Sequence, residues 1–127
     1  MTTVRELNNI TYAIRGAAFR VHSALGPGLL ESAYEACLLH ELRSNGYQVE
    51  RQVALPIRYR GVTLSAGYRI DLLVNDAVVI ELKSVDELAP VHTAQLLTYL
   101  RLSKRKLGLL MNFNVKNMQE GIKRYVM

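Results

Sequence analysis

Cysteine, proline, tryptophan and long hydrophobic runs are scarce in this chain of 127 residues. Cys37 stands alone, which excludes a disulfide scaffold. Apolar stretches such as residues 77–80 are short compared with the roughly 20 residues that a membrane-spanning helix needs, so no membrane span is expected. The N-terminus has no basic region followed by an apolar stretch. We therefore expect no signal peptide and a cytoplasmic location.

The remaining composition is typical of one folded domain. Half of the residues are hydrophobic and 21% are charged, which is far from the composition of disordered chains. No repeat or linker divides the chain, and its three prolines punctuate it without separating domains. We expect one domain over residues 1–127, with an N-terminal helix in 1–25, a core in 28–113 and a C-terminal tail in 114–127.

Basic residues outnumber acidic ones, sixteen to eleven, for a net charge of +5. A basic surface favours polyanionic partners, although many basic proteins bind none. Residues 101–124 hold seven basic side chains and one acid. Within them, Lys104, Arg105 and Lys106 are candidate contacts to a nucleic-acid backbone. A solvated turn is the alternative interpretation of these three residues.

The hydrophobic pattern predicts a mixed α/β order of helices and strands. A helical period over residues 4–25 ends at the Gly-Pro-Gly sequence of residues 26–28. The elements expected after it are a helix over 29–45, a strand over 47–57, extended chain over 62–74, a strand over 77–83, a helix from Pro90, a strand over 107–113, and a strand or short helix in 119–127.

Carboxylates interrupt two of the predicted apolar strands, at Asp71 and Glu81. A carboxylate among apolar strand residues is unfavourable unless something pairs with it. The strand period puts Glu81 and Lys83 on one face. Two carboxylates on adjacent strands suit a hard divalent cation such as Mg²⁺, and the nearby lysine suits water activation or stabilisation of phosphate charge.

The turn between these strands decides whether the two carboxylates meet. A strict two-residue turn at Asn75-Asp76 would pair Asp71 with Ile80, so that Asp71 and Glu81 would point to opposite faces. A turn of odd length, for example residues 75–77, or a bulge would place them opposite each other. Ion pairs of Glu81 with Lys83, or of Asp71 with Arg69, are the alternative to a metal site.

Several motifs in this order resemble one family. Residues 28–34 read Gly-Leu-Leu-Glu-Ser-Ala-Tyr and match the motif that names the GxxExxY proteins. Asp71, the Glu81-Leu82-Lys83 triplet and the Gln95-x-x-x-Tyr99 spacing follow. Together they resemble small, RecB-like members of the PD-(D/E)XK nuclease superfamily. The resemblance implies a restriction-endonuclease-type α/β fold, with a central mixed sheet flanked by helices.

The same resemblance implies a chemistry. It suggests hydrolysis of phosphodiester bonds that depends on Mg²⁺, or on Mn²⁺, with Asp71 and Glu81 as metal ligands and Lys83 as the catalytic lysine. The carbonyl of Leu82 would complete the metal shell. RecB-like enzymes often supply a histidine from the first core helix, whereas Glu31 is the candidate in this sequence. DNA is the favoured nucleic acid.

Two further pairs have a functional and a structural interpretation. Glu31 lies in the first turn of a predicted helix, where the helix dipole favours a carboxylate, and Tyr34 follows three residues later. Glu31 would reach the metal or its water with Tyr34 as a brace, or the two are a helix-end acid and a core tyrosine. Gln95 and Tyr99 share a helix face and either position the site or are ordinary packing.

We therefore expect a nuclease in which Glu31, Asp71, Glu81, Lys83, Gln95 and Tyr99 form the catalytic site, supported by Gly28 and Tyr34. A catalytically silent nucleic-acid-binding module of the same fold is the first alternative. A structural or interaction protein with an ion-pair network is the second. A homodimer or a protein partner would supply target choice, because a chain of this size has little surface beyond such a site.

Overall fold

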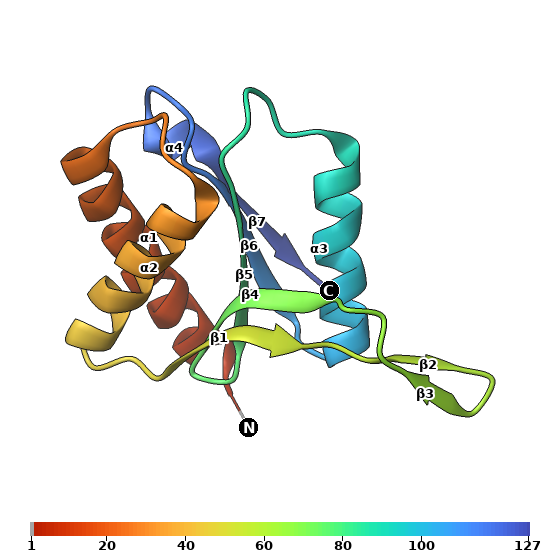
Figure 1. The fold of residues 1–127 in the computed structure, drawn as a ribbon. Helices are drawn as coiled ribbons and strands as arrows, with labels where there is room; N and C mark the ends of the chain where they lie inside the picture. Colours follow the sequence, from red (N-terminus) through yellow and green to blue (C-terminus); the bar gives the residue numbers. More distant parts are fainter. Residues whose placement is uncertain (1) are drawn as a thin grey trace.

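A five-stranded mixed sheet stands between two helical layers, and a two-stranded hairpin projects from it (Figure 1). This computed structural model describes residues 2–127; Met1, which belongs to the predicted segment 1–25, lies outside the described residues. The elements are α1 (Val4–Leu25), α2 (Glu31–Ser44), β1 (Val49–Ala54), β2 (Ile57–Tyr59), β3 (Val62–Leu64), β4 (Arg69–Val74), β5 (Val78–Lys83), α3 (Pro90–Ser103), β6 (Leu107–Asn112), α4 (Met118–Gly121) and β7 (Ile122–Val126).

The large sheet has the strand order β1-β4-β5-β6-β7. Only β5 and β6 run parallel, and α3 is the crossover helix that connects them. The C-terminal tail contains both structures offered for it, a short helix α4 and an edge strand β7 that pairs with β6. The expectation of a central mixed sheet flanked by helices is confirmed.

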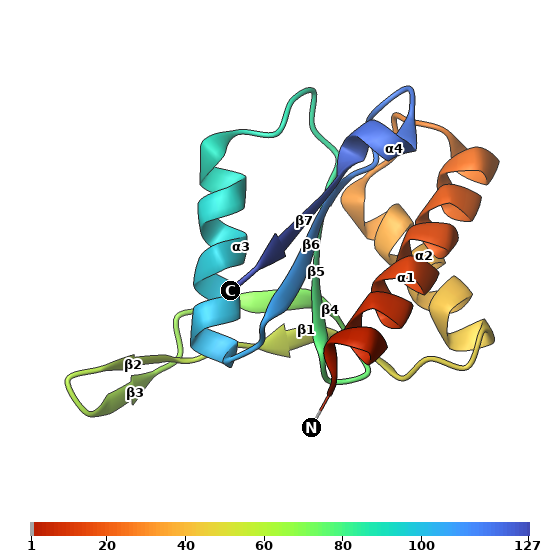
Figure 2. The same ribbon diagram turned by 180° about the vertical axis from the view of Figure 1, so that it is seen from behind.

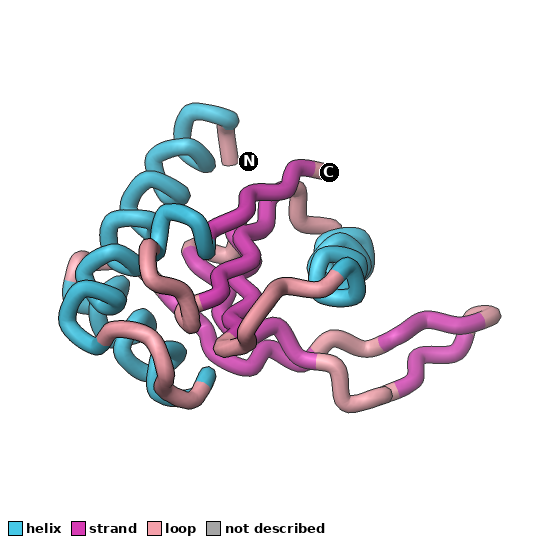
Figure 3. Tube along the Cα trace, turned by 90° about the horizontal axis from the view of Figure 1, so that it is seen from above, coloured by secondary structure: helices cyan, strands magenta, loops and turns pink. Residues whose placement is uncertain are grey.

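The predicted strand over residues 47–57 is wrong in its extent, because the chain leaves the large sheet at Pro56. Proline has no N–H to donate to a strand ladder, so β1 ends before it. The extended chain over 62–74 divides in the same way into β3 and β4. The strands β2 and β3 pair only with each other among the described residues, and they form an arm that extends away from the body (Figure 3).

Each face of the sheet has its own core. The helices α1 and α2 cover one face and α3 covers the other, which is clearest when the molecule is seen from behind (Figure 2). Strand residues alternate between the two cores, so Ile80 and Leu82 pack toward α1 and α2 while Val79 packs toward α3. None of the helices in residues 2–127 is long and apolar enough to cross a membrane.

A buried tyrosine holds the start of α2 in place. The hydroxyl of Tyr34 donates to the carbonyl of Gly26 at 2.6 Å and accepts from the N–H of Leu29 at 3.1 Å. Its ring stacks on Phe113 with centroids 4.7 Å apart. Gly28 adopts a φ of +99° with open space around its Cβ position, so backbone conformation and not crowding favours glycine there.

The same turn is tied to the end of β5. The hydroxyl of Ser84, the residue after β5, donates to the carbonyl of Leu29 at 2.5 Å. The first turn of α2 therefore lies close to the end of β5, where Glu81 and Lys83 are found.

Replacing Tyr34 by phenylalanine tests how much this hydroxyl stabilises the fold. Tyr34→Phe keeps the ring stacked on Phe113 but leaves the part-buried N–H of Leu29 and carbonyl of Gly26 without their partner. We expect the free energy of unfolding to fall by about 1–3 kcal/mol. Urea denaturation measures it. Tyr12→Phe is the matched control because that side chain is 81% exposed, and an equal effect of both variants would contradict the assignment.

Candidate active site

The turn between β4 and β5 has three residues, so the carboxylates meet. The ladder pairs Val74 with Val78 and Leu72 with Ile80, and one further step in this register sets Asp71 opposite Glu81. The register of a strict two-residue turn is therefore wrong. Asn75 and Asp76 have φ values of 50° and 54°, a conformation that these two residue types tolerate better than most.

Strands β4 and β5 separate beside this pair. Their ladder covers only Leu72–Val74 and Val78–Ile80, whereas β4 remains paired with β1 down to Arg69 and β5 with β6 up to Lys83. A gap therefore opens between two strands in the middle of the sheet. Backbone groups that would have formed the next rungs of the ladder face this gap.

Asp71 fills the gap with its carboxylate. Its Oδ2 accepts a hydrogen bond from the N–H of Leu82 at 2.9 Å, in place of a backbone carbonyl of β4. Its Oδ1 accepts a second bond from Nε2 of Gln52 at 3.2 Å. In a strand, the N–H and the C=O of one residue point to the same neighbour, so the carbonyl of Leu82 also points toward the gap.

Glu81 is the least satisfied charged group of the site. Only 3% of the residue is exposed, and its Oε1 is the one buried side-chain N or O atom in the described part of the chain without a hydrogen-bond partner. The pKa of Glu81 is raised to about 9, mainly by burial and further by the charge of Asp71 and a hydrogen bond with it, while the charge of Lys83 lowers it. A carboxylate in this setting holds a proton or needs a cation.

The ion pairs offered as the alternative do not form. The salt bridges among the described side chains are Arg20–Glu41, Arg51–Glu35 and Arg105–Asp76, and none of them involves Asp71, Glu81 or Lys83. No group of three or more histidine, cysteine, aspartate or glutamate side chains in residues 2–127 is arranged to hold a metal ion. The carboxylates of Asp71 and Glu81 lie together at the gap, and strand geometry directs the carbonyl of Leu82 toward it; oxygen is the ligand type that Mg²⁺ prefers.

Lys83 ends β5, two residues after Glu81 and on the same face of the sheet. The residue is half-buried. Its backbone carbonyl accepts from the N–H of Phe113 at 2.9 Å, which fixes the strand at this point. The side chain is therefore a cation beside two carboxylates that is held in no ion pair of its own within the described chain.

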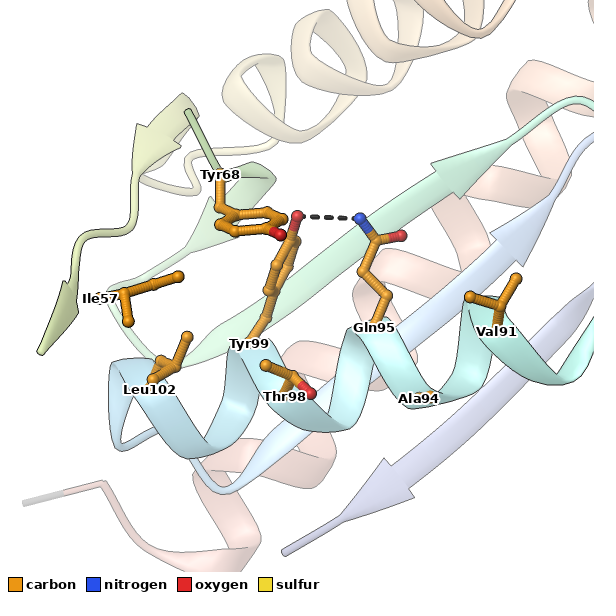
Figure 4. Close-up of a pocket in the computed structure, with 8 residues that line it drawn as sticks. All are labelled: Ile57, Tyr68, Val91, Ala94, Gln95, Thr98, Tyr99 and Leu102. Carbon is orange, nitrogen blue, oxygen red and sulfur yellow. Dashed lines mark hydrogen bonds between the residues drawn. The ribbon is translucent and has the colours of Figure 1, made fainter. Parts of the chain in front are cut away.

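The helix α3 places Gln95 and Tyr99 over the face of the sheet that also carries Glu81 and Lys83. Gln95 Nε2 donates to the hydroxyl of Tyr99 at 2.9 Å, and the two side chains extend from successive turns of the helix (Figure 4). Burial raises the pKa of Tyr99, the bond from Gln95 lowers it, and the negative charges of Glu81 and Asp71 add to the rise. The hydroxyl of Tyr99 is thus within electrostatic reach of both carboxylates.

A polar hollow of about 220 Å³ opens on the side of α2. The residues that line it are Glu31, Ser32, Glu35, Gln52, Asp71 and Leu82. Glu31 begins α2 and is exposed at the rim of the hollow. Tyr34, proposed as a brace for Glu31, bonds instead to the backbone of residues 26–29, so its contribution to the site is the placement of α2.

Two residues of this hollow escaped the sequence analysis. Glu35 is 6% exposed and accepts from Arg51 Nη2 at 3.0 Å and from Gln52 Nε2 at 2.6 Å. It lies four residues after Glu31, a spacing that puts both on one helix face and was a readable signal. Gln52 bridges Glu35 and Asp71, and no local pattern marked it.

Gln52 adopts a left-handed backbone conformation in the middle of β1, with a φ of 50°. Such a conformation is unfavourable for a residue other than glycine and persists only where the surroundings impose it. Here the surroundings include two hydrogen bonds of the Gln52 amide, which donates to Glu35 on α2 and to Asp71 on β4.

The basic run lies at the other end of the sheet. Residues 104–106 immediately precede β6. The first residue of β6, Leu107, pairs with Val78 at the start of β5, whereas Lys83 lies five residues later at the end of β5. Five strand residues span about 16 Å. Arg105 is engaged there in bonds to Asp76 and to the carbonyl of Ser103, while Lys104 and Lys106 are exposed.

One comparison with known proteins gives a match. A family model described as the PD-(D/E)XK nuclease superfamily matches residues 8–125. No curated protein and no solved structure matches the chain. The match runs from α1 to β7 and so includes every residue of the carboxylate gap.

The raised pKa of Glu81 predicts how stability depends on pH in the metal-free protein. Between the unfolded value of 4.5 and the folded value of about 9, the folded chain holds a proton that the unfolded chain has lost. The stability due to this group is complete below pH 4.5 and is lost as the pH rises toward 9, at no more than about 1.4 kcal/mol per pH unit. Glu81→Gln removes that dependence.

Urea denaturation in EDTA at pH 5, 6.5 and 8 measures the effect. The stability of Glu81→Gln relative to the unmodified protein should increase with pH. Glu50→Gln, an exposed acid on β1, should show no such trend. Parallel pH profiles for Glu81→Gln and the unmodified protein would contradict a protonated Glu81.

Proposed function

We propose that this chain, which belongs to the PD-(D/E)XK nuclease superfamily, hydrolyses phosphodiester bonds of nucleic acid, with DNA as the favoured substrate. The observation that carries the proposal is the buried Oε1 of Glu81, which lacks a partner beside Asp71 where β4 and β5 separate. A purely structural carboxylate at this depth would be paired. A buried and a half-buried carboxylate beside a lysine that is held in no ion pair within residues 2–127 suit a site that binds a cation and a phosphate.

Asp71, Glu81 and the carbonyl of Leu82 are the groups that would hold Mg²⁺ or Mn²⁺. The unpartnered Oε1 of Glu81 is the observation that fits a cation, since positive charge there would compensate this buried carboxylate and its neighbour Asp71. A divalent cation at this position supplies stabilisation of phosphate charge and a water of lowered pKa. Gln52 and the N–H of Leu82 hold the carboxylate of Asp71 in one orientation.

Lys83 provides the positive charge of the chain itself. On the same face as Glu81 and in no ion pair of its own, its ammonium group donates to a phosphate oxygen or orients the attacking water. Gln95 and Tyr99 form a bonded pair on the opposing helix, and the amide oxygen of Gln95 remains to accept from Lys83 or from water. Glu31 at the rim accepts a hydrogen bond from water that enters the hollow.

Cleavage assays test the proposal directly. Labelled single-stranded and double-stranded DNA and RNA are incubated with Mg²⁺, Mn²⁺ or EDTA. We expect cleavage that requires the metal and falls at least 100-fold in Lys83→Ala and in Asp71→Asn, because each removes a charge that acts on the reacting phosphate or its cation.

Lys116→Ala is the matched control, since this exposed lysine precedes α4 on the side of the sheet away from α3. It should cleave like the unmodified protein. Binding of nucleic acid without cleavage under any metal condition would favour the silent binding module of the same fold. Cleavage that survives both Lys83→Ala and Asp71→Asn would place the active site elsewhere.

Lys104 and Lys106 have a different expected effect, because they lie at the far end of the sheet. We propose that they contact the backbone of the nucleic acid at a distance from the reacting phosphate. Lys104→Gln with Lys106→Gln should raise KM and reduce the salt dependence of binding while kcat is retained. Steady-state kinetics at two salt concentrations measure this, and a loss confined to kcat would refute it.

A further inference from the structure

A mostly apolar groove of about 410 Å³ lies between α3 and the base of the hairpin arm. Ile57 of β2 and Tyr68 form one wall, and Tyr99 and Leu102 of α3 form the other (Figure 4). Its volume is within the range of pockets that accept small organic groups. Gln95 and Tyr99 belong both to this groove and to the candidate active site, so the two are continuous.

We propose that this groove binds an unpaired base, so that the substrate is a single strand or a single-stranded end of nucleic acid. The proposal rests on the proposed nuclease function and names its substrate class. A base suits the groove because an aromatic wall and a basic arm meet there, next to Gln95 and Tyr99 of the candidate active site.

Tyr68 supplies the stacking surface. Its side chain is 44% exposed although it packs edge-on against Tyr99, with ring centroids 6.1 Å apart and planes 66° apart. An edge-on contact leaves a ring face of Tyr68 uncovered by Tyr99. Bases stack readily on exposed tyrosine, but only unpaired bases can turn a face toward it. Base pairs in a duplex keep their faces stacked on each other.

The arm supplies charge complementarity. Residues 55–69 contain Arg58, Arg60 and Arg69 and no acidic residue. All three arginines are exposed, and the guanidinium of Arg60 lies over the ring of Tyr59 at 5.6 Å from its centroid. A strand with a base in the groove would run its phosphates past these side chains. Proteins that bind single-stranded nucleic acid usually combine an aromatic surface for the bases with positive side chains along the path of the phosphate backbone.

The same charges disfavour a second copy of this chain as the occupant. In a two-fold dimer each arm would meet a symmetry-related surface. Where the two arms lie side by side across the axis, the three arginines of each arm, with no acid among them, repel those of the other. A polyanion meets no such repulsion.

Equilibrium binding in EDTA tests the proposal separately from cleavage. The probes are a fluorescein-labelled 12-nucleotide DNA strand and the same strand in a duplex, followed by fluorescence anisotropy. We expect tighter binding of the single strand. Tyr68→Leu should weaken it by about 5- to 100-fold, which is the effect of losing one stacked base, and should leave duplex binding unchanged.

Three controls keep the result specific. Tyr68→Phe retains the ring and should bind like the unmodified protein. Tyr12→Leu changes an exposed tyrosine on α1 and should have no effect. Arg58→Gln with Arg60→Gln, on the exposed arm, leaves the core intact and should lower the salt slope of single-strand binding by about 1.4.

The proposal is overturned if Tyr68→Leu binds the single strand normally, or if it loses single-strand and duplex binding equally. It is also overturned if sedimentation shows a dimer of the unmodified protein that Tyr68→Leu abolishes, because the groove would then hold a second copy. Cleavage that persists alongside any of these results would sustain the nuclease proposal alone. Groove-dependent binding without any metal-dependent cleavage would sustain the base site alone.

Discussion

The meeting of a buried carboxylate, Glu81, with a half-buried one, Asp71, is the constraint around which this protein is arranged. Asp71 and Glu81 face each other at the point where β4 and β5 separate, in the middle of the sheet. Asp71 is satisfied by the N–H of Leu82 and the amide of Gln52, and Glu81 is left with an unpartnered oxygen. A buried carboxylate with an unpartnered oxygen beside a second acid needs a proton or a compensating cation, so the pair has the properties of a cation site.

Both helical layers converge on this pair. On one side, Tyr34 and Ser84 hold the first turn of α2 against the end of β5, and Glu35 on that helix shares Gln52 with Asp71. On the other side, the parallel connection between β5 and β6 requires a crossover, and α3 thereby presents Gln95 and Tyr99. The left-handed conformation of Gln52 is a local strain that links two of these elements through one amide.

The hairpin arm makes the two faces of the sheet unequal. It leaves the large sheet at Pro56 and returns at β4, two residues before Asp71, and the groove that it forms with α3 shares Gln95 and Tyr99 with the candidate active site. The face toward α1 and α2 holds the larger core, whereas the face toward α3 keeps an open, aromatic groove.

The sequence by itself determined the local features. The helical period over residues 4–25, the break at residues 26–28 and the apolar strand at 77–83 all follow from neighbouring side chains, and the structure retains them. The sequence also left two possible pairings for Asp71 and Glu81, depending on whether the turn between their strands has an even or an odd number of residues. The motif order pointed to the family that the comparison supports.

Only the tertiary structure decided the odd turn, the departure of the chain at Pro56, the bridge from Gln52 to Glu35 and the placement of Lys104 and Lys106 at the far end of the sheet. Each of these depends on strands and helices that are distant in sequence. Periodicity reports only which face of its own element a residue occupies. Strand order, strand separation and imposed backbone strain arise when those faces pack together.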